Sequence, residues 1–179
     1  MAEDLVAASH LHSLVSTFNG HSLRFALQKA LAVAIEIAHA DLGNIQLVDA
    51  ETGALRIVAH RGFGREFLRF FRQVHPQQGA CGTALQSRSR VIVQDVTDSP
   101  IFGDAKTIEV LLAAGVRAVQ STPLLGESGE LLGMISTHWR MPRRLQASQA
   151  IRLDALAQSV SRFIEWRAGA RGPAAYESN

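Results

Sequence analysis

The spacing of apolar residues changes from a helical period to an alternating one near residue 44 and returns to a helical period near residue 150. Before the first change, Leu27, Leu31 and Ile35 recur at four-residue steps, which is typical of an amphipathic helix. After it, Ile45 and Leu47 alternate with their neighbours, as in a strand with two distinct faces. Helices therefore enclose a central run of strands, and this order predicts an α+β domain.

Two turns divide the strands into hairpins. Residues 49–53 read Asp-Ala-Glu-Thr-Gly, and residues 126–129 read Gly-Glu-Ser-Gly. Both compositions favour tight turns between antiparallel strands. With further strands at 91–96, 116–125 and 131–139, we predict a twisted antiparallel sheet of five to six strands, in which Pro123 requires an edge or a bulge.

Helices are predicted on both sides of this sheet. A first helix over 5–18 ends at Asn19-Gly20, and Ser22 is expected to cap the next, whose Ala26, Ala30, Ala34 and Ala38 form a ridge suited to packing on a sheet. Short helices are expected over 63–72, through Ala84 and Leu85, and over 107–114, and a last helix ends near Gly169. We expect the terminal helices to cover one face of the sheet and the middle helices and loops the other.

The 179 residues fit one domain. We predict a helix over 1–20 that dimerises, a folded domain over 21–168 and a disordered tail over 169–179. The longest apolar stretch, 30–38, is interrupted by Glu36 and is too short to cross a membrane. Glu3 and Asp4 stand where an export signal has positive charge, and the lone Cys81 has no partner for an intrachain disulfide, so a cytoplasmic location is expected.

The charge pattern does not favour nucleic-acid binding. The formal net charge is +2, and the basic residues, almost all arginine, are scattered along the chain. A groove for DNA or RNA would require a dense basic face or aromatic stacking positions. We therefore expect no nucleic-acid partner.

Five segments of the chain together resemble a GAF domain, of the subtype found beside PAS and histidine kinase domains in bacterial two-component sensors. The resemblance covers about residues 26–167. It is carried by Gly-Ala-Cys-Gly-Thr-Ala at 79–84, Val-Gln-Asp-Val at 93–96, Asp-Ser-Pro-Ile-Phe at 98–102, Gly-Val-Arg-Ala-Val-Gln-Ser-Thr-Pro-Leu at 115–124 and Gly-Glu-Leu-Leu-Gly-Met-Ile-Ser-Thr-His-Trp at 129–139.

The resemblance implies a small-molecule pocket between one sheet face and the middle helices, and terminal helices that dimerise. Since the chain has no kinase phosphorylation box and no ATP-binding glycine-rich segment, we predict a non-catalytic sensory domain. It would bind a small molecule or sense redox state and signal as a homodimer, to a histidine kinase or another signalling protein. An apolar seam in the N-terminal segment supports dimerisation; it comprises Leu5, Leu11, Leu14, Val15 and Phe18.

Specialised GAF functions provide the alternatives. Free methionine sulfoxide reductases share a Gly-x-Cys-Gly-Thr-Ala segment, so Cys81 has an enzymatic interpretation, but that chemistry requires a second thiol that the chain lacks. The bilin-attachment context and the Asn-Lys-x-Phe motif of cyclic-nucleotide GAF domains are also missing, so the cofactor is unknown. A purely structural interaction module is a third interpretation.

Cys81 is either a redox sensor, its thiolate stabilised by a helix N-terminus, or a small side chain packed in a glycine-rich turn. The seven histidines show no metal-ligand spacing, so no metal site is predicted, and His138 is the candidate axial ligand for a haem. The remaining pocket candidates are aromatic residues of the middle helix and polar residues on strands and loops, any of which could instead be core or solvent-facing: Phe67, Phe70, Phe71, Gln94, Asp98, Phe102, Gln120, Ser121 and Ser136.

Overall fold

The computed structural model describes residues 22–171, and its elements follow the predicted order. The helix predicted over 5–18, with the dimerisation seam, lies outside the described residues, as does most of the predicted tail. The elements are α2 (Leu23–Ala38), β1 (Leu42–Val48), β2 (Leu55–Arg61), α3 (Arg65–Phe70), α4 (Gly79–Ser87), β3 (Val91–Val93), α5 (Ala105–Ala113), β4 (Ala118–Leu125), β5 (Leu131–Trp139) and α6 (Ala147–Arg171).

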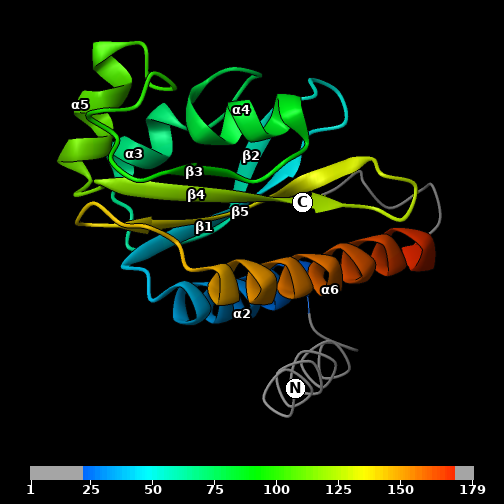
Figure 1. Cartoon of the computed structure of the whole chain (residues 1–179). Helices are drawn as coiled ribbons and strands as arrows, with labels where there is room; N and C mark the ends of the chain where they lie inside the picture. Colours follow the sequence, from blue (N-terminus) through cyan, green and yellow to red (C-terminus); the bar gives the residue numbers. More distant parts are fainter. Residues whose placement is uncertain (1–21, 172–179) are drawn as a thin grey trace.

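The five described strands form one antiparallel sheet in the order β2-β1-β5-β4-β3. The hairpins β1–β2 and β4–β5 meet through β1 and β5, which are far apart in the sequence. Figure 1 shows α2 and α6 beneath the sheet and α3, α4 and α5 above it. The predicted α+β fold, with terminal helices on one face and short helices on the other, is confirmed.

The lower layer is held together by α2. Ser22 caps this helix as predicted, because Phe25 N–H donates to Ser22 Oγ at 3.3 Å. The alanine ridge is buried along its whole length. At the other end of α2, Trp139 Nε1 of β5 donates to the Ala38 and His39 carbonyls, and Gln149 of α6 donates to the Ile37 carbonyl. These bonds satisfy the terminal carbonyls of α2 and fix it to both the sheet and α6.

Pro123 lies where the sheet tolerates it. β3 pairs only with residues 119–121 of β4, so this edge of β4 has no neighbouring strand at Pro123, and the β4–β5 register shifts between Leu124 and Leu125. An edge position suits a residue with no N–H to donate.

Several element boundaries differ from the prediction. The helix predicted over 63–72 is confined to α3, and the strand predicted over 91–96 ends at Val93, because Asp95 turns the chain by accepting bonds from Thr97. α4 begins at Gly79, so Cys81 lies in the first turn of a helix rather than in a turn that precedes one. α6 continues to Arg171, two residues beyond Gly169.

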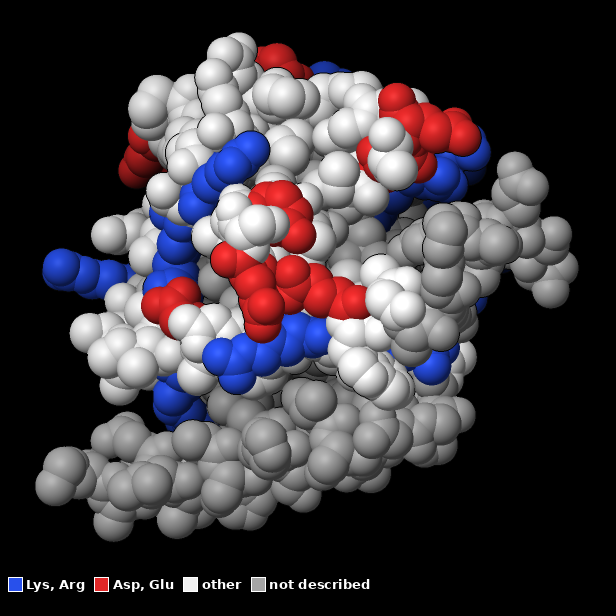
Figure 2. Space-filling model, turned by 90° about the vertical axis from the view of Figure 1, so that its right-hand side faces the viewer, with Lys and Arg blue, Asp and Glu red and all other residues white. Residues whose placement is uncertain are grey.

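The surface of the described residues carries both signs of charge. Figure 2 shows acidic and basic side chains interspersed on one end of the molecule, without a continuous basic patch in the described part of that face. No helix within residues 22–171 is long and apolar enough to cross a membrane.

Candidate functional site

A narrow cavity of about 30 Å³ lies between the upper face of the sheet and the helices above it. Its upper wall comes from α3, α4 and the adjoining loops, and its lower wall from β1, β4 and β5. The lining residues are Asn44, Gln46, Phe67, Phe71, Val74, Gln78, Gly79, Ala80, Cys81, Phe102, Leu111, Val119 and His138. This volume holds about two water molecules, so a larger occupant requires the two walls to move apart.

The lower wall is polar, although it is buried. On β1, Asn44 and Gln46 line the cavity, while Ile45 between them packs in the core layer of α2 and α6, as strand alternation requires. Asn44 Oδ1 and Gln46 Oε1 have no hydrogen-bond partner among the described residues, and neither does His138 Nδ1. All three side chains are almost completely buried. Buried polar atoms without partners are rare and costly, so this wall has unused hydrogen-bonding capacity that water or a ligand would satisfy.

His138 is held beneath a cluster of aromatic rings. The Phe63 and Phe67 rings are stacked with centroids 3.8 Å apart, and His138 meets both nearly perpendicularly, at centroid distances of 5.0 and 6.2 Å. Burial lowers the pKa of His138 to about 3, while a hydrogen bond to the Leu42 backbone acts weakly in the opposite direction. The imidazole is therefore neutral at physiological pH.

The lowered pKa predicts an acid-sensitive fold. Below about pH 6.5 the unfolded chain binds a proton at His138 that the folded chain does not bind until about pH 3, so the free energy of unfolding decreases as the pH falls. By pH 4.5 we expect His138 to account for a loss of about 2–3 kcal/mol. Urea unfolding between pH 4.5 and 7.5 should show this slope, and His138→Phe should reduce it.

The control is His75→Gln, which removes an exposed imidazole and should change the slope less than His138→Phe does. Asp49 and Asp95 titrate below this range, because hydrogen bonds from Arg56 and Arg117 lower their pKa values to about 2. An equally steep slope in His138→Phe would show that the charging of His138 is not the cause.

Cys81 reaches down from α4 to the sheet. Its Sγ lies 3.4 Å from Ser121 Oγ on β4 and 3.3 Å from Ser136 Oγ on β5, and the two hydroxyl oxygens are 2.9 Å apart. Burial raises the pKa of the Cys81 thiol, against the smaller opposing effect of the two serine hydrogen bonds. The neutral thiol is therefore favoured over the nucleophilic thiolate.

Two glycines set the height of α4 above the sheet. Gly79 has a φ of +64°, a conformation that favours glycine, and a Cβ there would lie 3.0 Å from the Phe102 ring. Gly82 presses against the preceding loop, so that a Cβ would lie only 2.3 Å from the His75 carbonyl oxygen. The loop and the helix therefore form one closely packed unit that carries Cys81.

The cavity lining contains no Asp, Glu, Lys or Arg side chain. Within residues 22–171 there is also no group of three or more His, Cys, Asp or Glu side chains placed to hold a metal ion. The hydrogen-bonding capacity of the site thus comes from carboxamides, one neutral imidazole and one thiol.

The structure brings most of the predicted pocket residues together. Five line the cavity, namely Phe67, Phe71, Cys81, Phe102 and His138. Ser121 and Ser136 lie directly below Cys81 and fix its position through hydrogen bonds.

Four predicted pocket residues lie elsewhere. Phe70 packs against the Phe71 ring without reaching the cavity. Gln94 and Asp98 are exposed and belong to a separate groove beside Arg143 and Arg144. Gln120 faces the layer of α2 and α6, because it is adjacent to Ser121 on the same strand and adjacent strand residues point to opposite faces.

The prediction missed Asn44, Gln46 and Gln78, which supply the carboxamides of the lining. The sequence does contain a signal for the first two. Asn44 and Gln46 alternate with Ile45 and Leu47, and in a central strand covered on both faces, the polar side of such an alternation is buried.

Comparisons with solved structures support the fold. A domain assigned to a two-component sensor histidine kinase protein from Sinorhizobium meliloti 1021 is 24% identical with a TM-score of 0.73, over 87% of this chain and all of that one. Free methionine-R-sulfoxide reductase from Neisseria meningitidis is 19% identical with a TM-score of 0.71, over 89% of each chain. The GAF domain of a phosphoenolpyruvate-protein phosphotransferase from Coxiella burnetii is 17% identical with a TM-score of 0.75, over 93% of this chain and 96% of that one.

These identities are low, so the similarities concern the fold. A search of curated proteins finds no match. A sequence model of the GAF domain, however, matches residues 20–165, which is most of the chain. The chain therefore belongs to the GAF domain family.

Proposed function

We propose that this GAF domain is a non-catalytic sensory domain that binds a small, uncharged polar molecule in the cavity between the sheet and α4. The observation that carries the proposal is the set of unpartnered polar atoms on the lower wall, on Asn44, Gln46 and His138. An occupant that forms hydrogen bonds with these side chains removes the free-energy cost of burying them unpaired.

The opposite wall favours an occupant with an apolar face. Phe67, Phe71 and Phe102 present their rings to the cavity and Leu111 extends this apolar surface, while Val119 adds an apolar side chain to the lower wall. Small-molecule sites typically combine such walls with a few polar groups that fix the orientation of the ligand. A planar molecule with one hydrogen-bonding edge matches the chemistry of both walls, and α4 must move away from the sheet to admit it.

The absence of charge in the lining argues for an uncharged ligand. No Asp, Glu, Lys or Arg side chain faces the cavity, and the lowered pKa of His138 keeps its imidazole neutral. A charged molecule would lose its hydration on entering without gaining a counter-charge. Free methionine sulfoxide carries both an ammonium and a carboxylate group, so the lining suits that substrate poorly.

The chemistry of Cys81 supports a non-catalytic role. The thiol has a raised pKa, and the chain contains no second cysteine that could resolve a sulfenic acid by forming a disulfide. The fold is similar both to a domain assigned to a sensor histidine kinase and to a free methionine-R-sulfoxide reductase. The residues of the cavity favour the sensory alternative.

Our proposal includes an output through the terminal helices. Ile151 and Trp166 on α6 are 67% and 49% exposed, so this helix presents apolar side chains that association would bury. We propose that the chain forms a homodimer through its terminal helices and signals to a histidine kinase or another signalling protein. Sedimentation velocity tests the dimer, and a monomer at micromolar concentration would contradict it.

The ligand class is tested with three compounds of similar shape: benzamide, benzoate and benzylamine. In NMR titrations at pH 7, we expect benzamide to shift the side-chain amide resonances of Asn44 and Gln46, and the charged compounds to bind at least about tenfold more weakly. Equal affinity for all three would contradict the proposal. So would turnover of free methionine sulfoxide with a thiol reductant, if it is lost in Cys81→Ser.

A further inference from the structure

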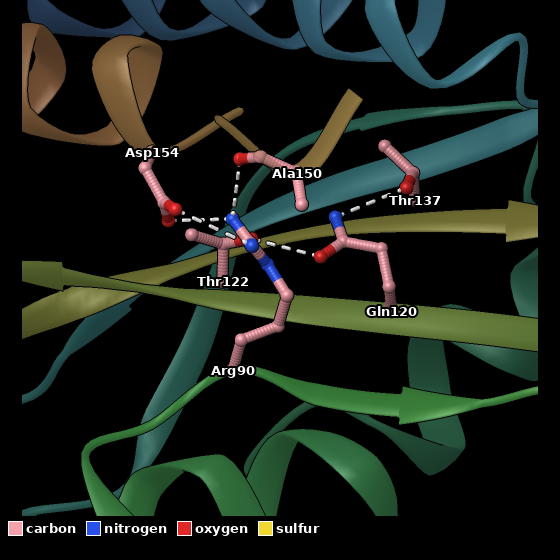
Figure 3. Close-up of polar contacts among 6 residues, drawn as sticks. All are labelled: Arg90, Gln120, Thr122, Thr137, Ala150 and Asp154. Atoms are coloured by element: carbon pink, nitrogen blue, oxygen red, sulfur yellow. Dashed lines mark hydrogen bonds and ion pairs between the residues drawn. The ribbon is translucent and has the colours of Figure 1, made fainter. Parts of the chain in front are cut away.

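Arg90 joins the helix above the cavity to the helix below the sheet. It lies between the end of α4 at Ser87 and the start of β3 at Val91. Its guanidinium donates hydrogen bonds to the Thr122 hydroxyl at 3.1 Å, to the Ala150 carbonyl at 3.0 Å and to both oxygens of the Asp154 carboxylate. Figure 3 shows Arg90 reaching from the β3 side of the sheet toward α6, which carries Ala150 and Asp154.

The contact continues into the buried interior as a chain of hydrogen bonds. Thr122 Oγ1 donates to Gln120 Oε1 at 2.8 Å, and Gln120 Nε2 donates to Thr137 Oγ1 at 3.1 Å (Figure 3). These three side chains are almost completely buried. Arg90 therefore connects an exposed carboxylate on α6 to polar groups on β4 and β5.

These hydrogen bonds lie in a layer that is mainly apolar around them. Ala118 and Leu124 of β4, Ile135 of β5 and Leu153 of α6 belong to the core cluster on the same face. In such surroundings a displaced amide or hydroxyl finds no alternative partner, so the bonded arrangement is well defined. A shift of Arg90 therefore changes its hydrogen bond to Thr122, and through Thr122 the bond to Gln120.

The same two strands carry polar contacts on their other face. Ser121, between Gln120 and Thr122, contacts Cys81 of α4, and Ser136, adjacent to Thr137, does so as well. α4 therefore reaches the strands directly through Cys81 and reaches α6 through Arg90. A displacement of α4 changes both contacts together.

The ion pair between Arg90 and Asp154 is weak enough to break. The Asp154 side chain is 57% exposed, and ion pairs with exposed partners contribute little to stability because water screens them. The Arg90 side chain, by contrast, is only 16% exposed and has neutral partners as well. The contact can therefore shift between states when α4 moves.

We propose that the contact of Arg90 with Asp154 and Ala150 is a latch that couples occupancy of the cavity to the packing of α6 on the sheet. An occupant lifts α4, draws Arg90 away from α6 and loosens the first half of that helix. This coupling rests on the proposed sensory function, for which it supplies the route from the cavity to the output helix.

The test mimics an occupant by substitution in the full chain. Cys81→Gln places a neutral carboxamide between α4 and the sheet. Hydrogen exchange of the amides at 150–158 of α6 is then measured by NMR, with the amides of α2 as an internal reference for global stability. We expect Cys81→Gln to raise α6 exchange at least about threefold relative to α2, and Arg90→Gln to raise it similarly.

The decisive sample combines the two substitutions. In the Arg90→Gln background, where the latch is already open, Cys81→Gln should change α6 exchange by less than about twofold. Asp154→Asn opens the latch from the other side and replaces Arg90→Gln if that variant does not fold. Arg152→Gln removes an exposed arginine of α6 with the same loss of charge and should behave as the wild type.

Two results would overturn the coupling. The first is that Cys81→Gln raises α6 exchange equally in the wild type and in Arg90→Gln. The second is that Cys81→Gln, made in the wild type, does not raise α6 exchange relative to α2. Because no ligand is used, either result leaves the ligand proposal to be judged by the benzamide titration. Conversely, a failed titration does not alter the exchange result.

Discussion

Gly82→Ala is expected to destabilise the domain by about 3 kcal/mol, although it adds only one methyl group. An ideal Cβ at this position lies 2.3 Å from the His75 carbonyl oxygen and 3.1 Å from Gln77 N. Both neighbours are backbone atoms, which cannot rotate away as a side chain can. The loop before α4 must therefore move, and the upper wall of the cavity moves with it.

Urea unfolding monitored by circular dichroism measures the effect. The matched control is Gly103→Ala, since a Cβ there meets nothing within 4 Å and the residue does not have a positive φ. We expect this control to lie within about 0.5 kcal/mol of the wild type. If Gly82→Ala is as stable as the wild type, the loop before α4 does not pack against Gly82.

The second large effect is expected from Asn44→Leu, which should raise the free energy of unfolding while it lowers the affinity for benzamide. Leucine has a similar size and no polar atoms, so it removes an unpartnered buried oxygen from the cavity wall. We expect the empty protein to become about 1 kcal/mol more stable, because a buried polar group without a partner is unfavourable. At the same time the affinity for benzamide should fall about tenfold through the lost hydrogen bond.

Gln120→Leu is the matched control for Asn44→Leu. Gln120 is also a buried carboxamide, but it bonds to Thr122 and Thr137 on the opposite face of the sheet. Its replacement should destabilise the protein by about 1–3 kcal/mol without weakening benzamide binding, because Gln120 does not line the cavity. Thermal unfolding with and without benzamide gives both quantities. If Asn44→Leu is the less stable of the two and still binds benzamide, the cavity wall is not a binding surface.

Much of the fold could be predicted from local patterns. The alternation at Ile45 and Leu47, the two turn segments and the cap at Ser22 depend on neighbouring residues only, and each is present in the structure. The early end of β3, by contrast, depends partly on a contact between distant residues. β3 ends early partly because the Asp95 carboxylate pairs with Arg117, and this pairing is not visible in a linear sequence.

The site was predictable only in part, for a related reason. Resemblance to a family indicated the aromatic residues and Cys81, whereas Asn44 and Gln46 required knowing that β1 is covered on both faces. Gln120 was predicted to line the pocket together with its neighbour Ser121. Adjacent residues of a strand point to opposite faces of the sheet, so only one of the two could face the cavity. Arg90 gave no signal, because its partners Thr122 and Asp154 lie 32 and 64 residues away.

The position of Pro123 has a consequence for behaviour at high concentration. The strand edge beyond β3 would otherwise offer the N–H groups of alternate residues to a strand from another molecule. Proline interrupts that row, and the shifted register at Leu124 and Leu125 distorts the backbone beside it. We therefore expect this stretch of β4 to be a poor template for intermolecular β-sheet growth, even though Leu125 is partly exposed there.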